Sequence, residues 1–130
     1  MVIDTSALIA YLEHEPDAAR VESALLAAPQ LLISAATVVE AGIVVEARRG
    51  ELAGRELDLL LHRLRVSVIP VGEVHADLAR SAWRRFGKGR HPAGLNFGDC
   101  FAYALAAEHG EPLLFVGSNF ARTDITAALT

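Results

Sequence analysis

Residues 1–12 read MVIDTSALIAYL, and this stretch joins a short apolar strand to a helix that follows almost at once. Met1 to Ile3 predict the strand, and the residues after Asp4 carry apolar side chains at helical spacing: Leu8, Ile9, Tyr11 and Leu12. Asp4 stands between the two elements, where its carboxylate can accept hydrogen bonds from free N–H groups at the helix start. A strand that leads into a helix is the repeating unit of α/β proteins, so the fold class depends on whether this pattern recurs.

The alternation of strands and helices continues along the whole chain. Further strands are predicted at Leu31–Ser34, Val66–Pro70 and Pro112–Gly117. Helices are predicted at about 5–12, 18–28, 37–49, 56–65, 73–86 and 97–109, with a loop at 87–96. Gly50 and Gly54 are expected to bracket the turn before helix 56–65. This order predicts a three-layer α/β/α domain around a central, mostly parallel sheet of four or five short strands.

Length and composition predict one globular domain that spans residues 1–130. The chain is 52% hydrophobic and 22% charged, which is enough apolar material for one good core. No apolar run approaches the roughly 18 residues of a membrane span, and the N-terminus lacks the features of a signal peptide, so we expect a cytoplasmic protein. The single cysteine, Cys100, excludes an internal disulfide and a zinc site with several thiolates, and we expect it to be a small buried side chain.

The distribution of charge is more informative than the net charge of −4, which argues against a generally basic surface for nucleic acid. The segment 80–91, RSAWRRFGKGRH, holds five basic side chains and no acid. An approaching phosphate backbone responds to such a local cluster. The alternative interpretation is a solvated helix face followed by a loop, and only a nearby acidic, metal-binding centre would favour nucleic acid.

Three acids stand where the chain changes direction beside apolar elements. Asp4 ends the first strand, Glu40 lies in the apolar stretch SAATVVEAGIVVEA, and Asp99 opens the helix of LNFGDCFAYALA. Each acid alone can be explained by helix capping: Thr37 and Glu40 fit a capping box, and Asn96 and Asp99 resemble a second one. Three separate caps among apolar neighbours are harder to explain, because a desolvated carboxylate is unfavourable unless it is paired.

A divalent cation would offset the burial of several carboxylates. Mg²⁺ and Mn²⁺ prefer carboxylate oxygens and keep several waters, so two or three acids are enough to bind them. Open parallel sheets usually bind ligands beyond the carboxyl ends of their strands, which is where Asp4 stands. A metal there can orient and activate a water for attack on a phosphodiester, so the acids indicate hydrolytic cleavage of nucleic acid.

Four stretches together resemble the PIN-domain ribonucleases, most closely the VapC-type toxins of bacterial toxin–antitoxin pairs: MVIDTSALIAYL, the helix with Glu40, GLNFGDCFAYALA and LLFVGSNFARTDI. The resemblance covers nearly the whole chain. It implies a Mg²⁺-dependent endoribonuclease toxin in which Asp4, Glu40 and Asp99 bind the metal, with Mn²⁺ as an alternative ion. It also implies that the hydroxyl groups of Thr5 and Ser6, and Ser6 above all, hydrogen-bond a metal-site carboxylate or a phosphate.

The stretch after the last predicted strand departs from the family pattern. The family commonly has a further acid there, whereas residues 117–120 of this chain read GSNF. Asn119 can ligate a metal through its amide oxygen but adds no charge, and Asp124 can substitute, although it also fits a turn or cap. The departure keeps open a different class of function, a catalytically weakened PIN-like module that binds RNA or a protein without cutting.

The resemblance also implies the partners. We expect an RNA substrate, a VapB-like antitoxin that blocks the acidic centre, and a homodimer. The basic residues expected to hold the RNA backbone are Arg84, Arg85, Lys88 and Arg90. Candidate dimer elements are the leucine-rich segment 57–64 and the helix before it, although both fit the core equally well.

Other kinds of site lack a required residue. A P-loop ending at Gly87 and Lys88 would need a glycine where Ala82 stands, and a haloacid-dehalogenase nucleophile would need an aspartate at Ser6. A receiver domain would need an aspartate at the end of VSVIP. The five histidines show no H-x-x-x-H spacing, so we expect them mostly at the surface. Trp83 is expected in the core or an interface, with base stacking as the alternative.

Overall fold

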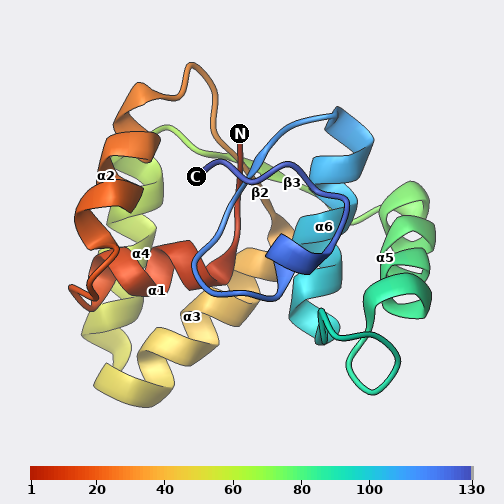
Figure 1. The fold of residues 1–130 in the computed structure, drawn as a ribbon. Helices are drawn as coiled ribbons and strands as arrows, with labels where there is room; N and C mark the ends of the chain where they lie inside the picture. Colours follow the sequence, from red (N-terminus) through yellow and green to blue (C-terminus); the bar gives the residue numbers. More distant parts are fainter. Residues whose placement is uncertain (130) are drawn as a thin grey trace.

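Six α-helices, four short β-strands and one 3-10 helix make up residues 1–129, the part of the chain that this computed structural model describes (Figure 1). In chain order they are β1 (Val2–Ile3), α1 (Thr5–Leu12), α2 (Ala18–Ala27), β2 (Leu32–Ser34), α3 (Ala35–Arg49), α4 (Glu51–Arg63), β3 (Ser67–Ile69), α5 (Glu73–Phe86), α6 (Phe97–His109), β4 (Leu113–Leu114) and η1 (Phe120–Arg122). No helix within residues 1–129 is both long and apolar enough to cross a membrane.

The four strands form one parallel sheet in the order β3-β2-β1-β4. β1 is one of the two central strands, and its Val2 is in register with Leu32 of β2 and Leu113 of β4. Because all the strands run the same way, their carboxyl ends lie along one edge of the sheet. The predicted α/β class is confirmed, and the sheet has four strands.

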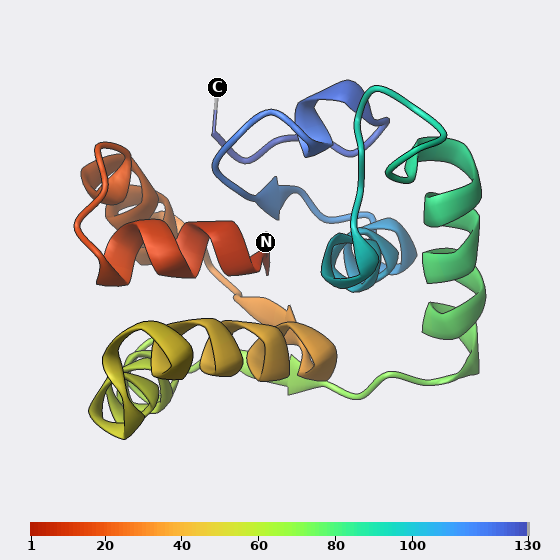
Figure 2. The ribbon, with the colours of Figure 1, turned by 90° about the horizontal axis from the view of Figure 1, so that it is seen from below.

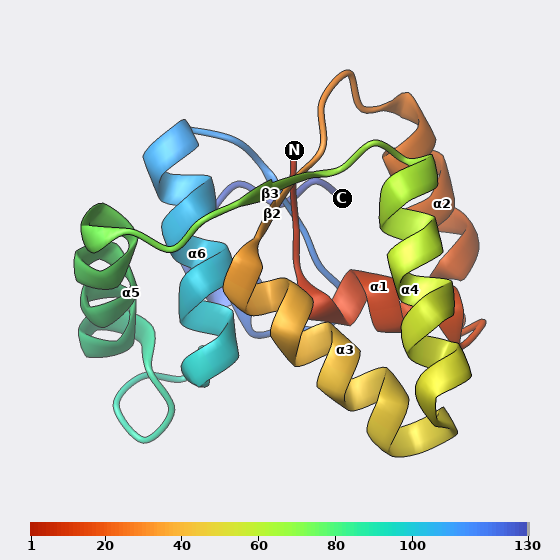
Figure 3. The same ribbon diagram turned by 180° about the vertical axis from the view of Figure 1, so that it is seen from behind.

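Helices cover both faces of the sheet and form the outer layers of the predicted three-layer fold (Figures 2 and 3). Successive side chains of a strand point to opposite faces, so each strand contributes to two cores. Val2 and Leu113 pack with α5 and α6, whereas Ile3 and Leu114 pack with α1, α2, α3 and α4. The two helical layers therefore belong to separate hydrophobic clusters that the sheet joins.

Three helices that follow a strand or a loop near the sheet are capped by side chains. Asp4 caps α1, Ser34 caps α3 and Asn96 caps α6. The capping box predicted at Asn96 and Asp99 is confirmed, because each side chain accepts a hydrogen bond from the other residue's backbone N–H. The capping box predicted at Thr37 is wrong, since Ser34 is the cap and Thr37 lies buried within the first turn of the helix.

The fourth helix begins earlier than the sequence indicates. Gly50, with a φ of +83°, makes the turn, and α4 then runs continuously through Gly54, so the predicted turn at Gly54 is wrong. A Cβ on Gly54 would lie 2.6 Å from Oε1 of Glu46 on α3. The glycine therefore sits inside a helix at a point where α4 packs closely against α3.

Several single side chains test predictions made from the sequence. Cys100 is buried as expected, and burial raises the pKa of its thiol to about 11. Leu57 and Leu61 face the core, so the leucine-rich segment serves at least in part as a core element. Among the five histidines, expected mostly at the surface, His75 is the buried exception. Trp83 is 47% exposed, so it is not a core residue, and its roles in an interface or in base stacking stay predictions.

We expect Gly54→Ala to raise the free energy of unfolding by roughly 0.5–1 kcal/mol, because alanine loses less backbone entropy than glycine in a helix interior. The Glu46 side chain that the new methyl group would meet is exposed and can rotate away. Urea unfolding of the two proteins measures the difference. A clear loss of stability would show instead that the contact with Glu46 cannot relax.

Candidate functional site

Asp4 is buried where β1 ends and α1 begins, with 3% of its surface exposed. The backbone N–H and the hydroxyl group of Ser6 both donate hydrogen bonds to Asp4 Oδ2, at 2.9 and 2.6 Å. The other oxygen, Oδ1, is also buried and has no hydrogen-bond partner among the described residues. Because a buried oxygen without a partner is unfavourable, Oδ1 is a free acceptor for a cation.

Asp99 lies in the first turn of α6, where the capping box with Asn96 orients it. The N–H of Asn96 donates to Asp99 Oδ2 at 3.0 Å, and the N–H of Asp99 donates to Asn96 Oδ1 at 2.9 Å. The Asn119 amide, from the stretch after β4, donates to the same Oδ2 over a long distance of 3.5 Å. Both hydrogen bonds that the Asp99 carboxylate accepts fall on Oδ2, so they fix the direction in which the carboxylate points.

Glu40 comes from the middle of α3 and is not a capping residue. The Thr5 hydroxyl group donates a hydrogen bond to Glu40 Oε1, which ties α3 to the first residue of α1. A Cβ on Gly98 would lie 1.8 Å from Glu40 Oε2, so the carboxylate rests against the backbone of α6. Gly98 is a site residue that the sequence analysis missed, and a glycine directly before Asp99 is its only signal.

The three acids line one cavity of about 330 Å³ at the carboxyl edge of the sheet. Asp4 comes from the end of the central strand β1, while Glu40 and Asp99 come from helices that lie on opposite faces of the sheet. The Val116 N–H donates to the Ser6 hydroxyl group at 3.0 Å, which brings the end of β4 to the same place. Figure 2 shows the first turns of α1, α3 and α6 gathered around this edge.

The cavity concentrates negative charge. Burial raises the pKa of Asp4 to about 6; hydrogen bonds from Ser6 offset part of this rise, and the charges of Asp99 and Glu40 add to it. Burial also raises the pKa of Asp99. Arg48, the one cation in the cavity wall, pairs with Glu13 at 2.8 Å and with none of the three acids. Within residues 1–129, the acids therefore lack a side-chain cation to neutralise them.

The residues present fit a divalent cation that is bound through oxygen. Asp4 Oδ1 has no other partner, and Glu40 and Asp99 bring two more carboxylates to the same cavity. Hard cations such as Mg²⁺ and Mn²⁺ prefer these ligands and complete their coordination with water. Neither histidine nor cysteine contributes to the cavity wall, so the ligand set does not favour softer metals.

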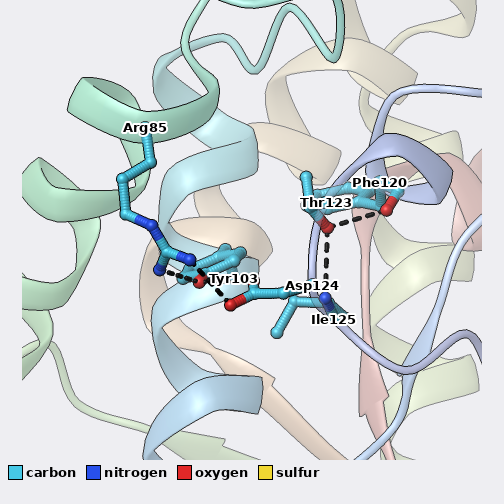
Figure 4. A network of polar contacts seen from close by, with 6 residues as sticks. All are labelled: Arg85, Tyr103, Phe120, Thr123, Asp124 and Ile125. Atoms are coloured by element: carbon cyan, nitrogen blue, oxygen red, sulfur yellow. Dashed lines mark hydrogen bonds and ion pairs between the residues drawn. The ribbon is translucent and has the colours of Figure 1, made fainter.

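Asp124 does not line the acidic cavity. It belongs instead to a polar network with Arg85 and Tyr103 (Figure 4). Its carboxylate accepts hydrogen bonds from the Tyr103 hydroxyl group at 2.7 Å and from Arg85 Nη2 at 2.9 Å. Burial raises the pKa of Asp124, but these hydrogen bonds and the Arg85 charge outweigh burial and lower it below its ordinary value. Asp124 thus ties the C-terminal segment to α5 and α6. Of the two candidates after β4, Asn119 is the one that contacts Asp99.

A groove of about 770 Å³ lies between α5 and α6 beside the acidic cavity. Arg84 and Lys88 line it, together with the exposed rings of Trp83 and Phe97. Asn96 lines both the groove and the acidic cavity, so the two hollows are neighbours. The basic segment predicted from the sequence therefore lies next to the acids.

The other two basic candidates are engaged by neighbouring side chains. Arg85 pairs with Asp124, and its guanidinium lies 4.7 Å from the ring centroid of Phe86. Arg90 lies over the Trp83 ring at 4.6 Å, an arrangement typical of a cation–π contact. Of the four candidates, the structure thus places Arg84 and Lys88 in the groove, which Arg80 also lines, and holds the other two against aromatic rings.

We expect Asp4→Asn to stabilise the metal-free protein well above pH 6 and to remove stabilisation by Mg²⁺. Because the pKa rises from 3.8 to about 6 on folding, ionisation of Asp4 opposes folding. The resulting loss of folding free energy is absent at low pH, grows between pH 3.8 and about pH 6, and reaches roughly 2–3 kcal/mol at higher pH. Thermal unfolding over this pH range, with Mg²⁺ or with chelator, measures both effects.

Asp58→Asn, an exposed position on α4, is the matched control. An Asp4 variant less stable than wild type at every pH would contradict the expectation.

Known proteins share both the sequence and the fold. The family profile described as PIN domain matches residues 1–125. Ribonuclease VapC30 of Mycobacterium tuberculosis is 57% identical over 130 residues, which cover 99% of each chain. The solved structure of Mycobacterium tuberculosis VapC20, titled a sarcin–ricin loop cleaving toxin, superposes with a TM-score of 0.78 at 19% identity, covering 99% of this chain and 98% of that one. A toxin–antitoxin complex from Klebsiella pneumoniae matches with a TM-score of 0.68 at 19% identity, covering 95% and 92%.

The two kinds of similarity support each other. The solved structures share the three-layer fold at low identity, and the curated relative shares more than half of its residues with this chain along almost its entire length. The resemblance predicted from the motifs around Asp4, Glu40 and Asp99 is confirmed at the level of the family. The chain belongs to the PIN-domain family, among its VapC ribonucleases.

Proposed function

We propose that this chain is the toxin of a toxin–antitoxin pair, a metal-dependent endoribonuclease that hydrolyses RNA phosphodiester bonds. The observation that carries the proposal is the cavity in which Asp4, Glu40 and Asp99 meet beside a basic groove. The identity to ribonuclease VapC30 along nearly the whole chain supports the same activity. In this proposal, the single domain predicted from the sequence carries the whole activity.

The three acids would hold the metal ion, and we propose Mg²⁺, with Mn²⁺ as the alternative. PIN-domain nucleases are metal-dependent, and when bound, such a cation orients the attacking water and neutralises charge on the leaving oxygen. Asp4 Oδ1 is the first candidate ligand, because it is buried and has no other partner. Ser6 holds the opposite oxygen of Asp4 and so sets the direction in which Oδ1 points.

The groove between α5 and α6 supports RNA binding next to the acids. Its basic side chains attract phosphates, and the ring of Phe97, which is 81% exposed, offers a surface on which a base can stack. Trp83 is also partly exposed, although Arg90 lies over its ring. Because Asn96 borders both hollows, a strand that follows the groove would pass the acidic cavity. The residues that we propose to contact or attract the RNA backbone are Arg84, Arg85, Lys88 and Arg90.

The proposed protein partner is a VapB-like antitoxin. One solved structure with this fold is a toxin–antitoxin complex, and the curated relative carries the VapC name. We also propose a homodimer through α3, the helix before the leucine-rich segment, because Val39 and Ile43 on it are 61% and 62% exposed. The proposed substrate and antitoxin both occur in the cytoplasm, where we place the protein.

Cleavage of total cellular RNA tests the activity. Wild-type protein should make discrete cuts with Mg²⁺ and none with a chelator. Asp4→Asn and Asp99→Asn should each lower the rate on the order of 100-fold or more, because each removes a charged ligand from the centre. Asp124→Asn is the matched control. It makes the same chemical change outside the cavity, so it should stay within a few-fold of wild type.

A second variant tests the site without removing an acid. Gly98→Ala should keep the fold and lose activity, because its methyl group would displace the Glu40 carboxylate. Circular dichroism checks that each variant is folded. An equal loss of activity in the Asp124→Asn variant would contradict the assignment of the reaction to the acidic cavity. Binding of RNA without cuts or metal uptake would favour the non-cutting module that the GSNF departure at 117–120 suggests.

Salt dependence tests the proposed RNA groove. Neutralising Arg84 and Lys88 together should weaken RNA binding and reduce the slope of log affinity against log salt by about 1.4, the value for two lost phosphate contacts with single-stranded RNA. Arg55→Gln with Arg63→Gln, two exposed positions on α4, is the control pair with the same charge change. If the salt slope is unchanged in the groove variant, or if it changes equally in the control pair, then Arg84 and Lys88 do not bind the RNA backbone.

A further inference from the structure

Three potential metal ligands gather at the end of the α5–α6 pair that lies away from the acidic cavity. His75 lies in the first turn of α5, and Glu108 and His109 are the last two residues of α6. One ligand atom from each side chain lies within 4.8 Å of the others. Asp99 opens α6 and His109 ends it, which separates the two groups by roughly 15 Å along the helix.

His75 is the buried member of this group, with 5% of its surface exposed. It occupies the first position of the α5 stripe that faces the core, followed by Ala79 and Ala82. Packing alone would be satisfied by a small apolar side chain, as at those two positions. A buried imidazole needs a polar partner, and His75 Nε2 contacts Glu108 Oε2 across the helix pair.

His109 completes the group from the solvent side. Its Nε2 lies 3.7 Å from Glu108 Oε2, and the side chains of Glu108 and His109 are 37% and 39% exposed. An ion therefore has access from solvent. Two imidazoles and one carboxylate form a ligand set that binds Zn²⁺ and leaves a fourth position for water. Imidazole nitrogen favours Zn²⁺ and other transition-metal ions over Mg²⁺, whereas the acidic cavity offers only oxygen ligands.

We propose that His75, Glu108 and His109 form a second metal site, specific for Zn²⁺-like transition metals, that fastens α5 to α6. One ligand comes from α5 and two come from α6, so bound metal links the two helices that border the basic groove. His75 and Glu108 are far apart in the sequence, so the unfolded chain does not hold them close together. Metal at this site therefore binds the folded state and raises its stability by mass action.

Titration of the full chain with Co²⁺, a visible-spectrum substitute for Zn²⁺, tests the site in the presence of excess Mg²⁺. The wild-type protein should bind one equivalent of Co²⁺ and show ligand-field absorption bands. Added Zn²⁺ should displace the Co²⁺ and abolish the bands, and it should raise the melting temperature of the protein. His109→Gln should weaken the affinity on the order of tenfold or more, because it removes one ligand. It leaves the buried contact between His75 and Glu108 in place, so it should fold.

Two controls locate the binding. His62→Gln removes an exposed histidine on α4 and should bind Co²⁺ as wild type does. Asp4→Asn should also bind Co²⁺ normally, because the acidic cavity is separate. No bands in wild type, bands that survive in His109→Gln, or bands lost in Asp4→Asn would each overturn the proposal. None of these readouts depends on RNA cleavage, so the second site and the proposed nuclease activity stand or fail separately.

Discussion

Burial of one carboxylate at the end of a central strand is the constraint on which the acidic cavity depends. Asp4 directly follows β1, so its side chain is buried rather than exposed to solvent. The start of α1 supplies hydrogen-bond donors for only one of its two oxygens. Burial raises the pKa of this group to about 6, so its ionised form at neutral pH is destabilised unless something compensates its charge. Burial raises the pKa of Asp4 and the charges of the other two acids add to the rise, so the cavity as built favours a cation.

Close backbone contact brings the other acids to Asp4 from opposite faces of the sheet. Glu40 reaches the first turn of α6 only because Gly98 has no side chain, and Thr5 holds it from the other side. Asp99 is oriented by the capping box that begins the same helix. Helices rather than loops therefore set the positions of Glu40 and Asp99, as a preorganised site requires.

Helix capping and a role in the acidic cavity proved to be compatible for the same residue. Asp4 and Asp99 both cap a helix and both line the cavity, because capping uses one oxygen and leaves the carboxylate facing the edge of the sheet. Local patterns failed where packing decided the outcome. Gly54 looks like a turn residue, but contact with α3 places it inside a helix, and Thr37 has the spacing of a cap but lies within the first turn.

The sequence by itself determined the fold class, the order of the elements and the three acids, because hydrophobic period, turn residues and isolated charges are local properties. Only the tertiary structure decided which distant residues meet. It joined Glu40 to Gly98, placed Asp124 against Arg85 instead of the acids, and brought His75 to Glu108 and His109. Contacts between residues far apart in the chain depend on how helices pack across a sheet, and no spacing within one segment encodes them.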